Sequence, residues 1–260
     1  MEVALIPPYC MLDAVLPGRK YRMLLPECLK HVAYKRAYQR LESGFTMLDN
    51  GMFEHEAMSN EALIELGLEY NVDELVMPDV RGDMDQTFSR VEEFLNVYCA
   101  MKFEDNEPGL MIAFQVTNVD EIPKFITRAT ALEYEYFNRR GVFTYGIPRR
   151  LAEGLGQSDM RVIIADWLQV MAPHNPVHLL GFARTSIQHI LSSNEIVMLS
   201  KRVRSIDTDA PFVWSTRGAH LEYDSLMVER PLNYFQLPSF RFDRGVVMDN
   251  IETLDRWAHA

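Results

Sequence analysis

The sequence predicts an α/β fold, in particular a (β/α)8 TIM-type barrel formed as a single domain over residues 1–260. Short apolar segments alternate with helix-length amphipathic segments, a pattern typical of βαβ units around a parallel sheet. A length of 260 residues also fits one such barrel. Four apolar segments end in carboxylate or amide side chains, and strand ends of this kind meet at the barrel mouth, where active sites lie. These segments are FTMLDNG (45–51), ELVMPDV (74–80), LMIAFQV (110–116) and RSIDTD (204–209).

Seven strands are expected along the chain, and the eighth is less well defined. The seven lie near residues 3–7, 45–49, 74–78, 110–116, 142–147, 176–182 and 204–207. Residues 212–214 or 244–248 are expected to supply the last strand. The stretch 215–243 contains Gly218, Pro231 and Pro238 and is expected to form an irregular loop or insertion over the barrel mouth. An open doubly wound sheet is disfavoured, because no glycine-rich phosphate loop follows the first strand.

Helices are expected between the strands from capping signals and apolar spacing. Ser59 is placed to cap a helix that contains Leu63. Residues 84–101 and 159–171 carry apolar side chains at helical spacing. Thr185 begins a capping-box pattern, and residues 250–259 are expected to form a closing helix.

Composition excludes several classes of protein. No apolar run approaches the roughly 20 residues that a membrane-spanning helix needs. The N-terminus MEVALIPPYC lacks the features of a signal peptide, so a cytoplasmic location is expected, in the host cell if a phage encodes the protein. The three scattered cysteines suggest thiols in a reducing compartment. No Cys/His cluster is present, and neither a metal nor a cofactor is expected.

The charge of the chain gives two opposing indications about nucleic acid. A net charge of −11 weighs against non-specific binding, which depends on a positive surface. Basic residues nevertheless cluster at 30–40, 139–140, 149–150 and 201–204. These clusters are either solvated helix faces or a local rim that binds phosphates, and composition does not choose between the two.

The motif LDNGMFE (48–54) is the most distinctive local signal. Asp49 ends a strand, and Asn50-Gly51 makes a tight turn in which glycine permits a positive φ. Phe53 then offers a flat ring on which a base could stack. The alternative interpretation is an ordinary βα turn in which the aspartate helps to cap the next helix.

The order of these motifs resembles that of the tRNA-guanine transglycosylase superfamily over about residues 45–215. The turn DNGMF (49–53) is similar to the family's Asp-Ser-Gly-Gly-aromatic turn and differs from it at two of five positions. Asp79 in VMPDV and Gln115 in IAFQV look like the family's base-reading residues, and Gly146 in YGIP like its pocket glycine. KRVRSIDTDAP is one residue shorter than the family's nucleophile motif, so it offers both Asp207 and Asp209.

Two departures from the tRNA enzymes refine this resemblance. The zinc-binding subdomain of the tRNA enzymes is missing, and the chain is much shorter. Both features resemble the compact phage-type DNA-guanine transglycosylases, which place 7-deazaguanine bases such as preQ0 in DNA. The resemblance implies that guanine in DNA is exchanged through a covalent Asp-deoxyribose intermediate. The partners would be DNA with a flipped guanine and a free 7-deazaguanine base, with a homodimer or accessory protein left open.

The resemblance also implies a role for each candidate residue. The nucleophile would be Asp207, with Asp209 as the alternative, and Asp49 would be the general acid and base. Asp79 and Gln115 would read the guanine edge, Gly146 would line the pocket and Phe53 would stack on the base. Basic residues near the mouth would hold the flanking phosphates; these are Arg149, Arg150, Arg184, Lys201 and Arg202.

Other interpretations stay open at this point. A tRNA-guanine transglycosylase would need a separate tRNA-positioning element. A non-catalytic nucleic-acid-binding paralogue is disfavoured by the retained aspartates, and an unrelated barrel hydrolase would not explain the order Asp, Asp, Gln, Asp. Asp207 and Asp209 could also be caps, and Gln115 could satisfy barrel backbone. The isolated histidines His174, His178 and His220 are expected to serve in the core or on the surface.

Overall fold

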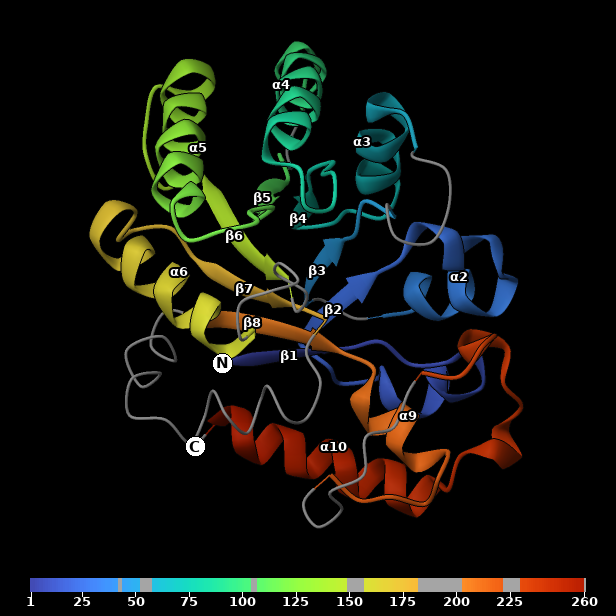
Figure 1. The fold of residues 1–260 in the computed structure, drawn as a ribbon. Helices are drawn as coiled ribbons and strands as arrows, with labels where there is room; N and C mark the ends of the chain where they lie inside the picture. Colours follow the sequence, from blue (N-terminus) through green and yellow to red (C-terminus); the bar gives the residue numbers. More distant parts are fainter. Residues whose placement is uncertain are drawn as a thin grey trace.

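The computed structural model of the protein describes residues 1–41, 44–51, 58–103, 107–148, 157–181, 203–221 and 230–259. Within 157–171 it describes the whole backbone, but not the side chains of residues 157–162 and 165. In these ranges eight parallel strands form one closed barrel in chain order (Figure 1). The predicted (β/α)8 TIM-type barrel is therefore confirmed. The strands are β1 (Glu2–Leu5), β2 (Tyr21–Leu24), β3 (Phe45–Leu48), β4 (Glu74–Val76), β5 (Gly109–Ala113), β6 (Phe143–Pro148), β7 (Val177–Leu180) and β8 (Val203–Thr208).

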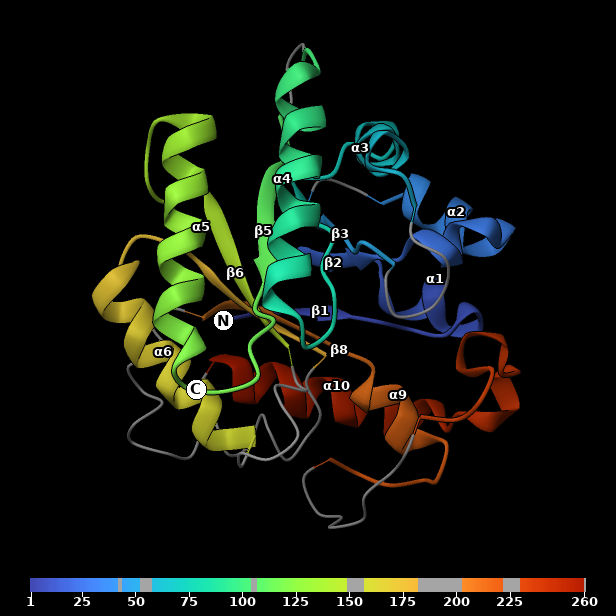
Figure 2. The same ribbon diagram turned by 45° about the horizontal axis from the view of Figure 1, so that its top comes forward.

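Helices surround this barrel. In Figures 1 and 2 the helices α2 to α6 follow one another around its outside, and α10 lies along β1 and β8. The α-helices are α1 (Leu12–Val15), α2 (Val32–Gln39), α3 (Asn60–Glu69), α4 (Met84–Ala100), α5 (Glu121–Phe137), α6 (Gln157–Met171), α9 (Ala210–Ser215) and α10 (Arg244–His259). Short 3-10 helices are η1 (Tyr9–Met11), η2 (Pro26–Lys30), η3 (Tyr234–Gln236) and η4 (Ser239–Arg241). No helix in the described ranges is long and apolar enough to cross a membrane.

The seven expected strands are confirmed, but the location of the remaining strand was wrong. It is β2, whose four residues YRML are all buried. Arg22 interrupts this short apolar run and hides the strand in the sequence. Residues 212–214 lie in α9, which Pro211 helps to start. Residues 244–248 lie in α10, where Asp243 Oδ1 accepts from the backbone N–H groups of Gly245 and Val246 at 2.9 and 3.2 Å.

The expected helices are also confirmed wherever the structure describes them. Ser59 Oγ accepts a hydrogen bond from Ala62 N at 3.2 Å and caps α3, as predicted. The helices expected at 84–101, 159–171 and 250–259 correspond to α4, α6 and α10. The helix expected from Thr185 lies outside the described residues. In the part of 215–243 that is described, Tyr234 is buried and its hydroxyl donates to Ile6 O at 2.7 Å, just beyond β1.

A charged group occupies the N-terminal end of the barrel interior. The Arg204 guanidinium on β8 pairs with the Glu74 carboxylate on β4 at 2.5 and 3.1 Å, and Thr144 Oγ1 on β6 donates to Glu74 at 2.5 Å. The guanidinium also lies 4.7 Å from the ring centroid of Phe45. Arg204 therefore faces into the barrel, and the interpretation of 201–204 as a phosphate-binding cluster is wrong for this residue.

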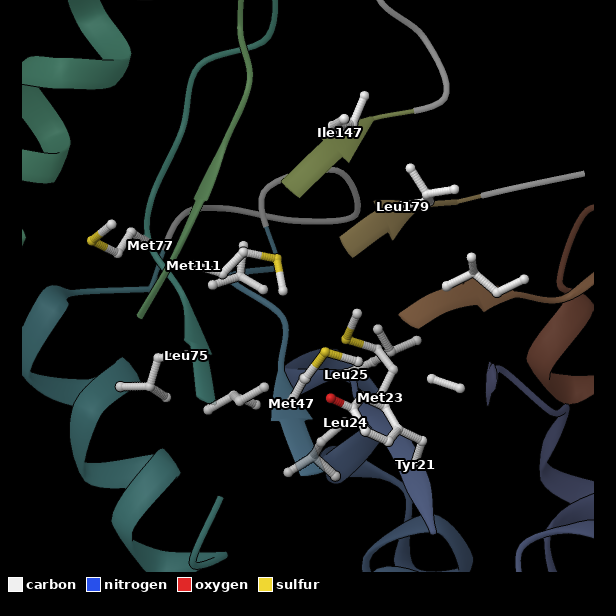
Figure 3. Close-up of a cluster of buried hydrophobic side chains, with 14 of the residues drawn as sticks. Tyr21, Met23, Leu24, Leu25, Met47, Leu75, Met77, Met111, Ile147 and Leu179 are labelled. Atoms are coloured by element: carbon white, nitrogen blue, oxygen red, sulfur yellow. The ribbon is translucent and has the colours of Figure 1, made fainter. Parts of the chain in front are cut away.

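A register shift explains how Arg204 reaches the interior. Val177 pairs with Val203, but the next residue of β7, His178, pairs with Ser205, so β8 has one extra residue at this point. Strand side chains otherwise alternate between faces, and a bulge of this kind re-aims them. The consecutive residues Arg204 and Ser205 can thus both point inward. Above them, methionines fill the space enclosed by the strands (Figure 3), among them Met23, Met47 and Met111.

The two ends of the chain are joined at the β1–β8 seam. β1 pairs with β8 along its whole length, from Glu2 with Ser205 to Leu5 with Thr208. On the outside, Arg19 Nη1 lies 2.8 Å from both carboxylate oxygens of Asp255 in α10. The closing strand and closing helix therefore complete the barrel at its first strand.

Candidate active site at the barrel mouth

The C-terminal ends of β3, β4, β5 and β8 bring the candidate polar residues to one mouth, as expected for this fold. Asp49 directly follows β3, and its backbone N–H donates to Leu24 O at 2.9 Å, which extends the pairing with β2. Its side chain is half-buried. Asp79 and Gln115 lie just beyond β4 and β5, and Asp207 is near the end of β8.

Asn50, Asp79 and Gln115 form one buried hydrogen-bonded group, which we call the amide–carboxylate cluster. Asn50 Nδ2 donates to Asp79 Oδ1 and to Met77 O, both at 2.8 Å. Gln115 Nε2 donates to Asp79 Oδ2, while Gln115 Oε1 accepts from Gly82 N at 2.9 Å. Asp79 is only 3 % exposed. Two predicted residues thus meet, and Asn50 joins them in a role that its place in a turn did not suggest.

The environment of Asp79 disfavours its charged form. Burial raises the pKa of the Asp79 carboxyl above its ordinary value of 3.8, and the hydrogen bonds from Asn50 and Gln115 oppose that rise. Both donors are fixed amides rather than cations, so the carboxylate is held in place without a neutralising charge in the cluster. Such a group suits a site that recognises an uncharged ligand through hydrogen bonds.

The raised pKa of Asp79 predicts how stability depends on pH. The folded protein binds a proton at Asp79 more readily than the unfolded chain, so this group's contribution is present below 3.8 and is lost as pH rises through the folded pKa. Asp79→Asn removes that dependence. We expect the unfolding free energy of the variant, relative to the wild type, to rise as pH increases above 3.8 toward the folded pKa of Asp79, as measured by urea titrations. If the difference in unfolding free energy between the variant and the wild type stays constant or falls as pH rises, the pKa of Asp79 is not raised in the folded protein.

Asp207 is held by a second buried group on the opposite side of the barrel from β4. Its Oδ1 accepts from Gly181 N at 2.9 Å and lies 3.0 Å from His178 Nε2. His178 Nδ1 lies 2.7 Å from Ser205 Oγ. Asp207 is 5 % exposed, and His178 is fully buried. His178 is therefore a core residue, as expected, but it also contacts the predicted nucleophile, which its lone position in the sequence did not reveal.

The structure separates the two candidate nucleophiles. Asp207 lies within β8, whereas Asp209 follows the strand at the N-terminal boundary of α9. Asp209 Oδ2 lies 3.6 Å from Arg230 Nε, and both side chains are partly exposed. The Arg230 guanidinium also covers the rings of Tyr234 and Phe235 at 5.0 and 4.7 Å. Asp209 thus contacts the segment after residue 229, whereas Asp207 is held by Gly181 and His178 at the strand ends of the barrel.

Two glycines shape the mouth. Gly51 has φ +69°, which agrees with the predicted turn, and a Cβ there would lie 3.8 Å from Glu27 Oε2. Glu27 is a further carboxylate near the mouth, and it was missed together with β2. Gly146 pairs with Ala113 and with His178 in register. A Cβ on Gly146 would come within 2.8 Å of Leu180 Cδ1, so the absence of a side chain is required by the packing there.

Several predicted site residues lie outside the described residues, so their roles stay predictions. They are Phe53, Arg149, Arg150, Arg184, Lys201 and Arg202. The stacking surface and most of the proposed phosphate rim therefore have no structural description. Among the described residues, no group of three or more His, Cys, Asp or Glu side chains is arranged to hold a metal ion.

Comparisons with known proteins add little to this geometry. No family model matches the chain, and no curated protein matches it. Among solved structures, it is similar to "QR15, an Aldolase", with 12 % identity, a TM-score of 0.46 and coverage of 80 % of this chain and 89 % of that chain. A similarity of this size bears on no function, so the chemistry must be argued from the site itself.

Proposed function

We propose that the protein is an enzyme of the base-exchange glycosyltransferase type, which replaces guanine in DNA by a 7-deazaguanine base such as preQ0. The observation that supports this proposal most is the placement of two different polar groups at one barrel mouth. Asp207 on β8 lies opposite the amide–carboxylate cluster beyond β3, β4 and β5. One side offers a carboxylate for attack on a sugar, and the other offers donors and acceptors for a purine edge.

The amide–carboxylate cluster has the hydrogen-bonding capacity that guanine requires. The N1–H and 2-amino groups of guanine are donors, and each carboxylate oxygen of Asp79 can accept more than one hydrogen bond. The side-chain amide of Gln115 has a second N–H that can donate to O6 or N7. An uncharged purine would thus be read by groups that the protein already holds in fixed positions.

The proposed reaction proceeds in two balanced steps. A lone pair of the Asp207 carboxylate forms a bond to C1′ as the C1′–N9 bond breaks, and the departing electron pair remains on the guanine. Asp49 donates a proton to that base. In the second step Asp49 accepts the proton of the incoming base, whose nitrogen attacks C1′ and releases the Asp207 carboxylate. The backbone of the nucleic acid is never cut, and no oxidant or metal enters the balance.

Access to the target requires the guanine to leave the duplex. Flipping a base costs a few kcal/mol, which stacking and edge hydrogen bonds offset. We assign the stacking to Phe53 and the contacts with flanking phosphates to the basic residues that follow the strands. With a net charge of −11, the protein would have to bind DNA through such local contacts rather than through its overall field.

A base-exchange assay tests the proposal directly. Labelled guanine or preQ0 is incubated with the protein and either double-stranded DNA or tRNA, and the nucleosides are then identified by mass spectrometry. We expect incorporation into DNA and none into tRNA. Incorporation into tRNA alone would show a tRNA-guanine transglycosylase instead. If neither nucleic acid is labelled but both are bound, the non-catalytic paralogue replaces our proposal.

A further inference from the structure

We infer that Ser205 and His178 form a buried relay that holds Asp207 ready for attack through one particular oxygen, Oδ2. This inference rests on the proposed function and extends it to residues that do not touch the substrate. In the relay, Ser205 Oγ donates to His178 Nδ1, and His178 Nε2–H donates to Asp207 Oδ1. His178 is then a positioning residue rather than a catalytic one.

The contacts at Asp207 distinguish its two oxygens. Oδ1 receives Gly181 N–H at 2.9 Å and lies 3.0 Å from His178 Nε2. Within the described part of the chain, Oδ2 accepts no hydrogen bond from a protein donor. Donors lower the nucleophilicity of the oxygen that they engage, and they also fix the orientation of the carboxylate. The oxygen left for bond formation with C1′ is therefore Oδ2.

The tautomer of His178 follows from its two neighbours. A carboxylate accepts hydrogen bonds and donates none, so the nitrogen that faces Asp207 must carry the proton. In the neutral ring of the fully buried His178 the proton is therefore on Nε2, which leaves Nδ1 to accept from Ser205 Oγ at 2.7 Å.

Tyr21 lies beside the relay, near Ser205. Burial raises the pKa of Tyr21 to about 12, so the hydroxyl keeps its proton. Tyr21 is fixed by stacking on Phe45, with ring centroids 4.6 Å apart. The charged groups around it are Arg204 and Glu74, which pair with each other, and Glu2. The β8 bulge makes the relay possible, because it turns both Arg204 and Ser205 inward.

Two replacements of His178 separate positioning from packing. Gln can place an amide N–H where Nε2 stands and keep the bond to Asp207, whereas Asn can replace only Nδ1 and loses that bond. With a guanine-containing DNA duplex as the probe, we expect His178→Asn to slow covalent protein–DNA adduct formation about 100-fold. His178→Gln should remain within about 10-fold of the wild type, and guanine affinity should be unchanged in both. Equal losses in the two variants would overturn the relay in favour of simple packing.

A measurement without activity tests the tautomer. Long-range 15N–1H spectra of protein labelled with 15N-histidine should show His178 with its proton on Nε2, with His174→Gln as a control for assignment. Ser205→Ala removes the donor to Nδ1 and should shift the Nδ1 resonance of His178, while the proton stays on Nε2. A proton on Nδ1 in the wild type, or no response to Ser205→Ala, would overturn the relay. If the wild type forms no adduct with DNA, the proposed function fails, and these spectra still decide whether the relay exists.

Discussion

Replacing Asp207 by asparagine is expected to abolish covalent adduct formation and base exchange, by a factor on the order of 10³ or more. The asparagine amide has nearly the shape of the carboxylate, and its oxygen can still accept from Gly181 and His178. It carries no charge, however, and cannot stabilise an oxocarbenium-like transition state or form a glycosyl ester. The loss should be measured as adduct on denaturing gels and as exchanged nucleoside.

The matched control for this variant is Asp209→Asn. Asp209 lies two residues further along the chain, outside β8, and its Oδ2 lies 3.6 Å from Arg230 Nε. We expect it to retain most of the exchange rate. Urea unfolding should place Asp207→Asn within about 1 kcal/mol of the wild type, because its contacts are largely kept. A dead Asp209→Asn beside an active Asp207→Asn would reverse the assignment of the nucleophile.

Replacing Arg204 by methionine is expected to lower the free energy of unfolding by about 3 kcal/mol. The Glu74 carboxylate is only 4 % exposed and depends on Arg204 for its ion pair. Without the guanidinium, its charge stays buried with Thr144 as the remaining side-chain donor among the described residues. Removing one partner of a buried ion pair therefore lowers the free energy of unfolding by more than the intact pair contributes to it. Denaturant unfolding monitored by circular dichroism gives the difference directly.

A compensating change and a surface control make this result specific. Replacing Glu74 by methionine in the same protein removes the orphaned charge and should restore most of the lost stability. Lys35→Met, which breaks the exposed pair with Glu69, should leave stability nearly unchanged. If Arg204→Met alone were as stable as the wild type, the barrel interior would have to accommodate the Glu74 charge in another way.

The barrel could be predicted from the sequence wherever a strand is a continuous apolar run. β5, with the run LMIA, is of this kind, and it lies where it was expected. β2 could not be found, because four residues interrupted by Arg22 give no clear alternation or run. The wrong choices for the last strand, 212–214 and 244–248, are apolar as well, but Pro211 and Asp243 start helices there. Local capping chemistry decided between helix and strand in both segments.

The site was predictable in its strand-end residues and not in their partners. Position at a strand end was enough to predict that Asp79, Gln115 and Asp207 lie in the site, since every parallel strand of a barrel ends at the same mouth. His178 and Ser205 could not be linked to Asp207, because their contact depends on a one-residue shift between β7 and β8. A sequence without register information cannot show that Arg204 and Ser205 face the same way. The pairing of Glu74 with Arg204, 130 residues apart, was hidden for the same reason.

The seam between β1 and β8 also sets the order in which this protein can be completed during synthesis. β1 is the first strand of the barrel to leave the ribosome, yet Glu2 pairs with Ser205, 203 positions later. At ordinary rates of translation, that edge of β1 waits roughly 10–40 s for its partner. Throughout that interval the growing sheet has two open edges, which can pair with other chains. The nascent chain is therefore most exposed to aggregation just before β8 emerges, and the bond between Arg19 and Asp255 can form only after that stage.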